Sequence, residues 1–182
     1  WEDLNKLIPH MLLEGIMGYP FSCPDMIGGG QFTSFLDDAP IDQELVVRST
    51  QVHALMPMMQ FSVAPWRILD ERHFNAVLDA VNLRNKFKET ILRLAKKAST
   101  NGEPIVRSME YVYPHKGYVD ITDQFMLGNS ILVAPYLSKG EGSRKVILPK
   151  GSWKSDTGKV FKGGKSITVN VPLTRLPYFI KE

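Results

Sequence analysis

The side chains best suited to chemistry lie in residues 18–30, where an acid follows a short apolar run. Asp25 ends this run, and the glycines Gly28, Gly29 and Gly30 follow within five residues. Glycine permits positive φ and lets the backbone approach a ligand closely. The pattern favours a strand that ends at a loop where a carboxylate meets a ligand. It also fits an ordinary turn with Asp25 as a turn or cap residue, so residue types alone leave both interpretations open.

Other reactive groups show no catalytic or metal-binding spacing. The histidines are isolated in the sequence, which favours surface or structural roles: His10, His53, His73 and His115. The single cysteine, Cys23, lies in the apolar run without a basic neighbour that would lower its thiol pKa, so a nucleophilic role is not expected. The sequence therefore predicts neither a metal site nor a complete catalytic site.

The elements around Asp25 alternate between helix and strand. Apolar spacing and apolar runs predict the order helix, strand, helix, strand, over residues 2–17, 19–23, 42–55 and 58–63. Asp37 and Asp38 fall in the expected loop 28–40, where solvation is enough to explain them. Strands that alternate with helices indicate a parallel sheet covered by helices. Ligands bind such sheets at the C-terminal ends of strands, where Asp25 and residues 60–63 are expected to lie.

A long helix and a series of short strands follow. The helical pattern over residues 70–98 has Asp70 as its expected N-cap and Gly102 as its expected stop. Its apolar stripe favours core packing over a partner-binding face. Strand-like runs separated by turn residues follow at 104–107, 131–135, 146–148 and 167–171. This spacing predicts an antiparallel sandwich or small barrel, with a domain boundary near residue 102.

Composition and charge narrow the classes of function. The chain has 43% hydrophobic and 23% charged residues, which is ordinary for a globular protein. No apolar run approaches the roughly 20 residues of a membrane span, and no secretory signal pattern is present. Residues 139–182 hold ten basic and three acidic residues. The lysines are spaced singly, so a solvated surface is favoured over nucleic-acid binding.

The order of motifs resembles the C-terminal portion of glycoside hydrolase family 31, which contains α-glucosidases, α-xylosidases and related exo-acting α-glycosidases. The motifs are Gly-Tyr-Pro-Phe at 18–21 with Pro-Asp-Met-Ile-Gly-Gly at 24–29, Asp-Gln-Phe-Met-Leu-Gly at 123–128, Ile-Leu-Val-Ala-Pro at 131–135, Leu-Pro-Lys-Gly-Ser-Trp at 148–153, and Val-Pro-Leu at 171–173 with Leu-Pro-Tyr-Phe at 176–179. A single motif would be weak, but this ordered set covers essentially the whole chain.

The resemblance implies an α/β part followed by an all-β part. Residues 1–102 would form the last two β/α units of a (β/α)8 barrel, and residues 103–182 a C-terminal antiparallel β-sandwich. It also implies a retaining exo-α-glycosidase, which hydrolyses terminal α-linked sugars by double displacement with two carboxylates about 5 Å apart. Both carboxylates would lie upstream of Trp1, so the chain is expected to be a fragment without a catalytic residue.

The resemblance also implies the partners of the chain. An oligosaccharide or glycoside is the expected substrate, with no metal, no cofactor, no nucleic acid and no membrane. Exposed barrel edges predict that the isolated fragment self-associates. The alternative is a non-catalytic carbohydrate-binding or structural β-sandwich module.

The expected substrate-binding residues are Asp25, Gln60 and Ser62. In the family, the residue matching Asp25 is a substrate-binding carboxylate at a strand end. Residues 60–62 align with an Arg-Asn-His sequence that usually ends the eighth strand, so the family histidine is missing here. An aromatic residue often found after the glycines is missing too. With Pro65-Trp66 following, the pattern resembles a branch that includes α-galactosidase-like members, which makes an α-galactoside the leading substrate.

Overall fold

The computed structural model describes residues 1–29 and 41–182. Gly30, Asp37 and Asp38 therefore lie outside the described residues. The helices are α1 (Glu2–Ile16), α2 (Gln43–Ala54), the short 3₁₀ helix η2 (Pro65–Arg67), α3 (Glu71–Asn101) and α4 (Met109–Val112). The strands are β1 (Val106–Arg107), β2 (Phe125–Leu127), β3 (Ile131–Val133), β4 (Gly142–Leu148), β5 (Ser152–Ser155), β6 (Val160–Lys162), β7 (Lys165–Val171) and β8 (Tyr178–Lys181).

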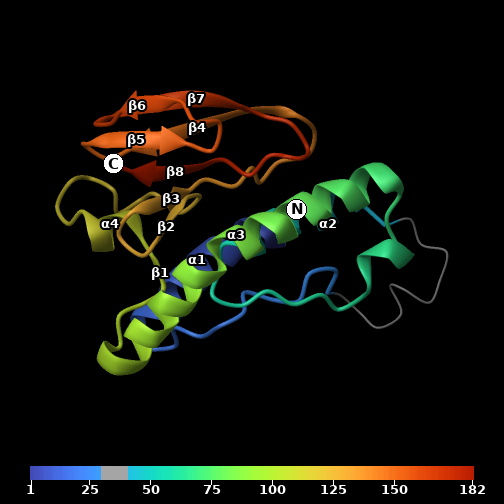
Figure 1. The fold of residues 1–182 in the computed structure, drawn as a ribbon, viewed down its shortest axis with the longest axis horizontal. Coiled ribbons are helices and arrows are strands. Elements are labelled where there is room, and N and C mark those ends of the chain that lie inside the picture. The colour runs from blue at the N-terminus through green and yellow to red at the C-terminus, as the bar shows by residue number, and fades with distance from the viewer. Residues whose placement is uncertain (30–40) are drawn as a thin grey trace.

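A six-stranded antiparallel sheet packs against the helices through β1, β2, β3 and β8, whereas β5 and β6 lie away from them (Figure 1). Its strand order is β1-β2-β3-β8-β5-β6, and a second sheet pairs β4 with β7. In the centre of the large sheet, Phe125, Val133 and Tyr178 share one face, whereas Met126, Leu132 and Phe179 share the other. Because side chains alternate along a strand, the sheet contributes to two separate hydrophobic cores.

The first core, here called the helix core, joins α1, α2 and α3 to one face of the large sheet. Its members include Ile8, Leu55, Ile91, Val133 and Tyr178. The ring of Phe87 meets that of Tyr178 edge to face, with centroids 5.2 Å apart. The second core, here called the β core, fills the space between the two sheets and contains Trp153, Phe179, Val146 and Val171.

Capping residues explain where the helices begin and end. Asp70 accepts a hydrogen bond from the backbone N–H of His73 at 2.9 Å, and Gly102 closes α3 with φ 72°. Both capping predictions are confirmed. Asp42 caps α2 in the same way, through the N–H of Leu45 at 3.2 Å. These local bonds satisfy the free N–H groups of each first turn.

The two strands predicted near the N-terminus are wrong as continuous elements. Residues 19–23 form a turn at Pro20 and Phe21 with irregular chain on either side, and Tyr19 is 64% exposed. Pro20 and Pro24 lack the N–H groups that a central strand needs, which explains this difference. Among the described residues, 58–63 contribute a single bridge, in which Phe61 pairs in parallel with Ile27.

The predicted antiparallel β architecture is confirmed after Gly102. All four predicted strand runs contain a strand, with shifted bounds, and the buried pattern of β7 leaves one face solvated. The strands missed from the sequence are β2, β5, β6 and β8. Each has three or four residues, too few to show a clear period of two.

Helix α2 is bonded directly to the β region. The guanidinium of Arg48 is fully buried and donates to the carbonyl oxygens of Gly140, Val171 and Pro172 at 3.3–3.4 Å. The amide of Gln51 donates to the carbonyl of Leu173 at 2.6 Å. These bonds fix α2 against the segment that follows β7.

Candidate functional site

The loop that carries Asp25 is shaped by the glycines after it. The Asp25 side chain is exposed, and its Oδ1 accepts a hydrogen bond from the N–H of Met26 at 2.6 Å. Gly28 has φ 75°. A Cβ on Gly29 would lie 2.7 Å from the carbonyl oxygen of Met26 and 3.5 Å from Oδ1 of Asp25. Glycine is therefore needed at position 29, because the backbone there passes close to the carbonyl of Met26.

The three predicted substrate-binding residues come from two segments that the structure places side by side. The N–H of Ile27 donates to the carbonyl of Gln60 at 2.8 Å, and the N–H of Ser62 donates back to the carbonyl of Ile27 at 3.0 Å. The hydroxyl of Ser62 donates to the same carbonyl at 3.1 Å. Ile27 is fully buried, whereas the side chains of Asp25, Gln60 and Ser62 are exposed.

Sequence reasoning missed the role of His53. This residue of α2 is fully buried, and its Nε2 lies 2.8 Å from the carbonyl oxygen of Asp25. Its Nδ1 lies 2.7 Å from the carbonyl oxygen of Ser49. Burial lowers the pKa of His53, while both hydrogen bonds and the charge of Asp25 oppose that shift. The polar residues of α2 carried no signal of this role, because polar side chains on a helix are ordinarily expected to face solvent, whereas Arg48, Thr50, Gln51 and His53 are buried here.

Arg84 of α3 was also missed. Its guanidinium donates to the carbonyls of Ala54, Met56 and Pro57 at 2.8–3.2 Å, just after the end of α2. Ala54 supplies one of the terminal carbonyls that a helix leaves without partners, and a cation at this end is favourable. Burial lowers the pKa of Arg84. The arginine fixes the path of the chain that leads to Gln60.

Cys23 is not poised as a nucleophile. Its thiol donates to the carbonyl of Asp25 at 3.2 Å, and burial raises the pKa of the thiol. A thiol with a raised pKa carries little thiolate at neutral pH. This agrees with the sequence prediction that Cys23 has no nucleophilic role.

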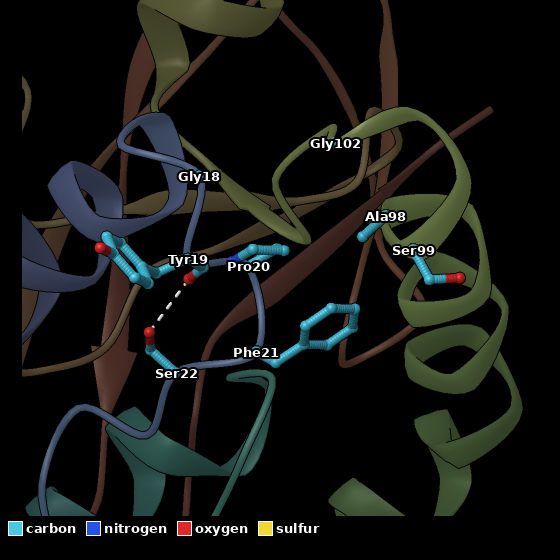
Figure 2. A pocket seen from close by; sticks show the side chains of 8 residues that line it. All are labelled: Gly18, Tyr19, Pro20, Phe21, Ser22, Ala98, Ser99 and Gly102. Carbon is cyan, nitrogen blue, oxygen red and sulfur yellow. Dashed lines mark hydrogen bonds between the residues drawn. The ribbon is translucent and has the colours of Figure 1, made fainter.

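A separate open pocket of about 380 Å³ lies between the segment after α1 and the C-terminal end of α3. Figure 2 shows the ring of Phe21 directed toward Ala98 and Ser99, and the hydroxyl of Ser22 bonded to the carbonyl of Tyr19 at 3.0 Å. Asp25, Gln60 and Ser62 do not line this pocket. Its lining is mainly apolar, so it lacks the convergent polar groups that a sugar needs.

The site can hydrogen-bond a polyhydroxylated ligand through an exposed carboxylate, an amide and a hydroxyl. A carboxylate accepts bonds from hydroxyl groups more strongly than a neutral side chain does. Within residues 1–29 and 41–182, no group of three or more His, Cys, Asp or Glu side chains could hold a metal ion. Nor is any helix in these ranges long and apolar enough to cross a membrane.

The β region matches a known domain family. Residues 102–182 match the model of the glycosyl hydrolase family 31 C-terminal domain. Residues 102–182 thus form a family 31 C-terminal domain, and the whole chain is similar to solved family 31 enzymes.

Individual relatives match over nearly the whole chain. The chain is 37% identical to the myogenesis-regulating glycosidase of Mus musculus over 97% of its length, and 32% identical to an alpha-glucosidase of Saccharolobus solfataricus over 100%. The solved structure of a family 31 dextranase from Flavobacterium johnsoniae in complex with glucose aligns over 100% of the chain, with a TM-score of 0.88 and 29% identity. The chain covers 26%, 27% and 23% of these three proteins, about a quarter of each.

Proposed function

We propose that the full-length protein containing this chain is a retaining exo-α-glycosidase, in which this chain binds substrate but supplies no catalytic carboxylate. Residues 1–102 would be the last two β/α units of a (β/α)8 barrel, and residues 103–182 the β-sandwich that follows. The proposal extends the family assignment to the activity of a protein about four times longer than the chain, as the coverage of its relatives suggests.

One observation carries the proposal. The parallel bridge between Ile27 and Phe61 brings the Asp25 loop beside residues 60–62. Parallel pairing at this position is what neighbouring barrel strands would have, and their C-terminal ends are where barrel enzymes bind substrate. Asp25, Gln60 and Ser62 would then hydrogen-bond the hydroxyl groups of the terminal sugar.

The reaction would need two further carboxylates upstream of Trp1. A nucleophile would form a covalent glycosyl-enzyme intermediate, and an acid/base would protonate the leaving oxygen and then activate water. The proposed role of this chain is to hold the sugar against those groups. The released sugar should initially keep its anomeric configuration, which NMR of the fresh product would detect; an inverted product would contradict the mechanism.

The first test is hydrolysis of p-nitrophenyl α-galactoside, α-glucoside and α-xyloside by the full-length protein. We expect the α-galactoside to give the highest kcat/KM. Asp25→Ala should lower kcat/KM about 100-fold, because a hydrogen bond to a charged group contributes about 1.5–3 kcal/mol and a sugar has several hydroxyl groups. Asp25→Asn should lower it less, because the amide keeps an acceptor but loses the charge.

A matched control separates binding from folding. Asp79 of α3 is also an exposed acid, and Asp79→Ala should leave both activity and thermal stability unchanged. Equal activity of Asp25→Ala and Asp79→Ala would exclude Asp25 as a substrate ligand. Lack of hydrolysis by the wild-type protein, with every α-glycoside tried, would favour a non-catalytic carbohydrate-binding or structural role.

A further inference from the structure

His53 connects helix α2 to the backbone of the Asp25 loop. The two ring nitrogens face two carbonyl oxygens, that of Ser49 at 2.7 Å and that of Asp25 at 2.8 Å. A neutral imidazole can donate only one hydrogen bond, whereas an imidazolium donates two. Ser49 is four residues before His53, so its carbonyl already has a helical N–H partner. Donation from Nε2 is therefore the more useful bond, because the carbonyl of Asp25 otherwise accepts from the weak thiol donor of Cys23, at 3.2 Å.

The contact lies at the residue whose side chain would bind the sugar. The backbone of Asp25 is held by His53 on one side, and two residues later Ile27 is paired with Gln60 and Ser62. Arg84 in turn donates to the carbonyls that immediately follow His53 in the chain, including those of Ala54 and Met56. The loop is thus fixed from the buried side while its carboxylate stays exposed.

We infer that His53 is a positioning residue that sets the orientation of the Asp25 carboxylate through its Nε2 hydrogen bond to the Asp25 backbone. The inference rests on the proposed function of Asp25 as a sugar ligand. A small displacement of a positioning group is costly, because binding depends on hydrogen bonds of narrow length and angle. His53 does not itself reach the ligand, since the ring is fully buried beneath the loop.

The choice of substitutions separates the two ring contacts. In His53→Gln the side-chain amide nitrogen has about the reach of Nε2, so it can still donate to the Asp25 carbonyl. In His53→Asn the shorter amide has about the reach of Nδ1 and can bond only near Ser49. Thr50→Val is the matched control, because Thr50 is equally buried in α2 and its hydroxyl donates to the Val46 carbonyl at 2.8 Å, away from the Asp25 loop.

The experiment measures KM and kcat for the best α-glycoside with the full-length protein. We expect His53→Asn to raise KM about 10- to 100-fold with a smaller change in kcat, and His53→Gln to restore most of the loss. Thr50→Val should leave KM unchanged even if it lowers stability. Equal KM values for wild type and His53→Asn, or an equal rise in Thr50→Val, would overturn the inference.

Hydrogen exchange gives a second readout that needs no activity. The amides of Met26 and Ile27 should exchange faster in His53→Asn than in wild type or His53→Gln, while amides of α3 stay unchanged. Faster exchange in a protein without glycosidase activity would support the positioning role and reject the proposed function. Unchanged exchange in an active protein would reject the positioning role alone.

Discussion

At the scale of single residues, the site depends on how one exposed acid is held by buried neighbours. Asp25 uses one carboxylate oxygen for the N–H of Met26, as a turn residue would. Its side chain nevertheless stays exposed beside Gln60 and Ser62, as a ligand-binding residue requires. The two interpretations that the sequence left open are therefore compatible. The local bond shapes the loop, and within residues 1–29 and 41–182 no hydrogen bond engages the other carboxylate oxygen.

Protonation of His53 gives a prediction at this scale. Burial lowers the pKa of His53 below its ordinary value of 6.5, and the charge of Arg84 acts in the same direction while that of Asp25 opposes it. The unfolded chain therefore binds a proton more readily than the folded chain. This contribution to the free energy of unfolding is complete above pH 6.5 and is lost as the pH falls from 6.5 through the folded pKa.

Urea unfolding at about pH 7.5 and about pH 5 checks this prediction. Wild type should lose more stability between the two values than His53→Gln, whose side chain does not titrate. The carboxyl groups with lowered pKa values, such as Asp42 and Asp70, titrate at lower pH and are common to both proteins. An identical loss in the two proteins would show that His53 is not buried in its neutral form.

At the scale of elements, the helices could be predicted and the short strands could not. Helix α3 has a strong period and a cap at each end, Asp70 and Gly102, so its limits follow from local chemistry. The run at 19–23 is apolar, but Pro20 within it and Pro24 after it lack the N–H groups that a central strand needs. Strands of three residues such as β2 and β6 are defined by their pairing partners, which the local sequence does not specify.

The candidate site was predictable only in part. Asp25, Gln60 and Ser62 follow from the expected strand ends, and the structure does place their segments together. His53 and Arg84 could not be assigned, because their partners are backbone carbonyls. Every residue supplies a carbonyl, so sequence does not show which one a buried cation or imidazole will meet.

Gly163 gives a prediction at the scale of the β region. A Cβ at Gly163 would lie 1.8 Å from the carbonyl oxygen of Pro149 and 2.9 Å from Nε1 of Trp153. These two groups are hydrogen-bonded to each other at 2.8 Å inside the β core. Gly163→Ala should therefore lower the free energy of unfolding by about 3 kcal/mol, as overpacking against rigid backbone does.

The control for Gly163 is Gly158→Ala. Gly158 has φ 83° and open space around its Cα, so only backbone strain of about 1 to 2 kcal/mol is expected. Urea unfolding followed by the fluorescence of buried Trp153 measures both. A smaller loss for Gly163→Ala than for Gly158→Ala would mean that the turn next to Pro149 can open without disturbing the β core.

At the scale of the whole molecule, two cores share the six-stranded sheet. The helix core and the β core meet the sheet on opposite faces, and residues from both sides of position 102 fill the helix core. Arg48 and Gln51 add direct bonds from α2 to residues 140 and 171–173. The helical and β regions should therefore unfold together.

Arg48→Leu tests this cooperation. Removing the fully buried guanidinium takes one donor from each of the carbonyls of Gly140, Val171 and Pro172. It also removes the cation that lies 3.6 Å from Glu44. We expect a loss of about 3 kcal/mol in the free energy of unfolding. In wild type, hydrogen exchange in rising urea should show α2 and β7 opening together. In Arg48→Leu, α2 should open before β7.

Arg175→Leu serves as the control for Arg48→Leu. Arg175 pairs with Asp156 at 2.7 and 2.8 Å, and both residues belong to the β region. This variant should lose stability while α2 and β7 still open together. Simultaneous opening in Arg48→Leu as well would show that the shared sheet, rather than the arginine, couples the two regions.

Because the two faces of the large sheet belong to two different cores, recombination between relatives is constrained. Phe125, Val133 and Tyr178 contact the helices, while Met126, Leu132 and Phe179 between them contact the second sheet. Recombination that exchanged residues 103–182 between two relatives would bring a foreign set of side chains to the helices. We expect such chimaeras to fold only when α1, α2 and α3 come from the same parent as residues 103–182. The helices and the β region should therefore be inherited together.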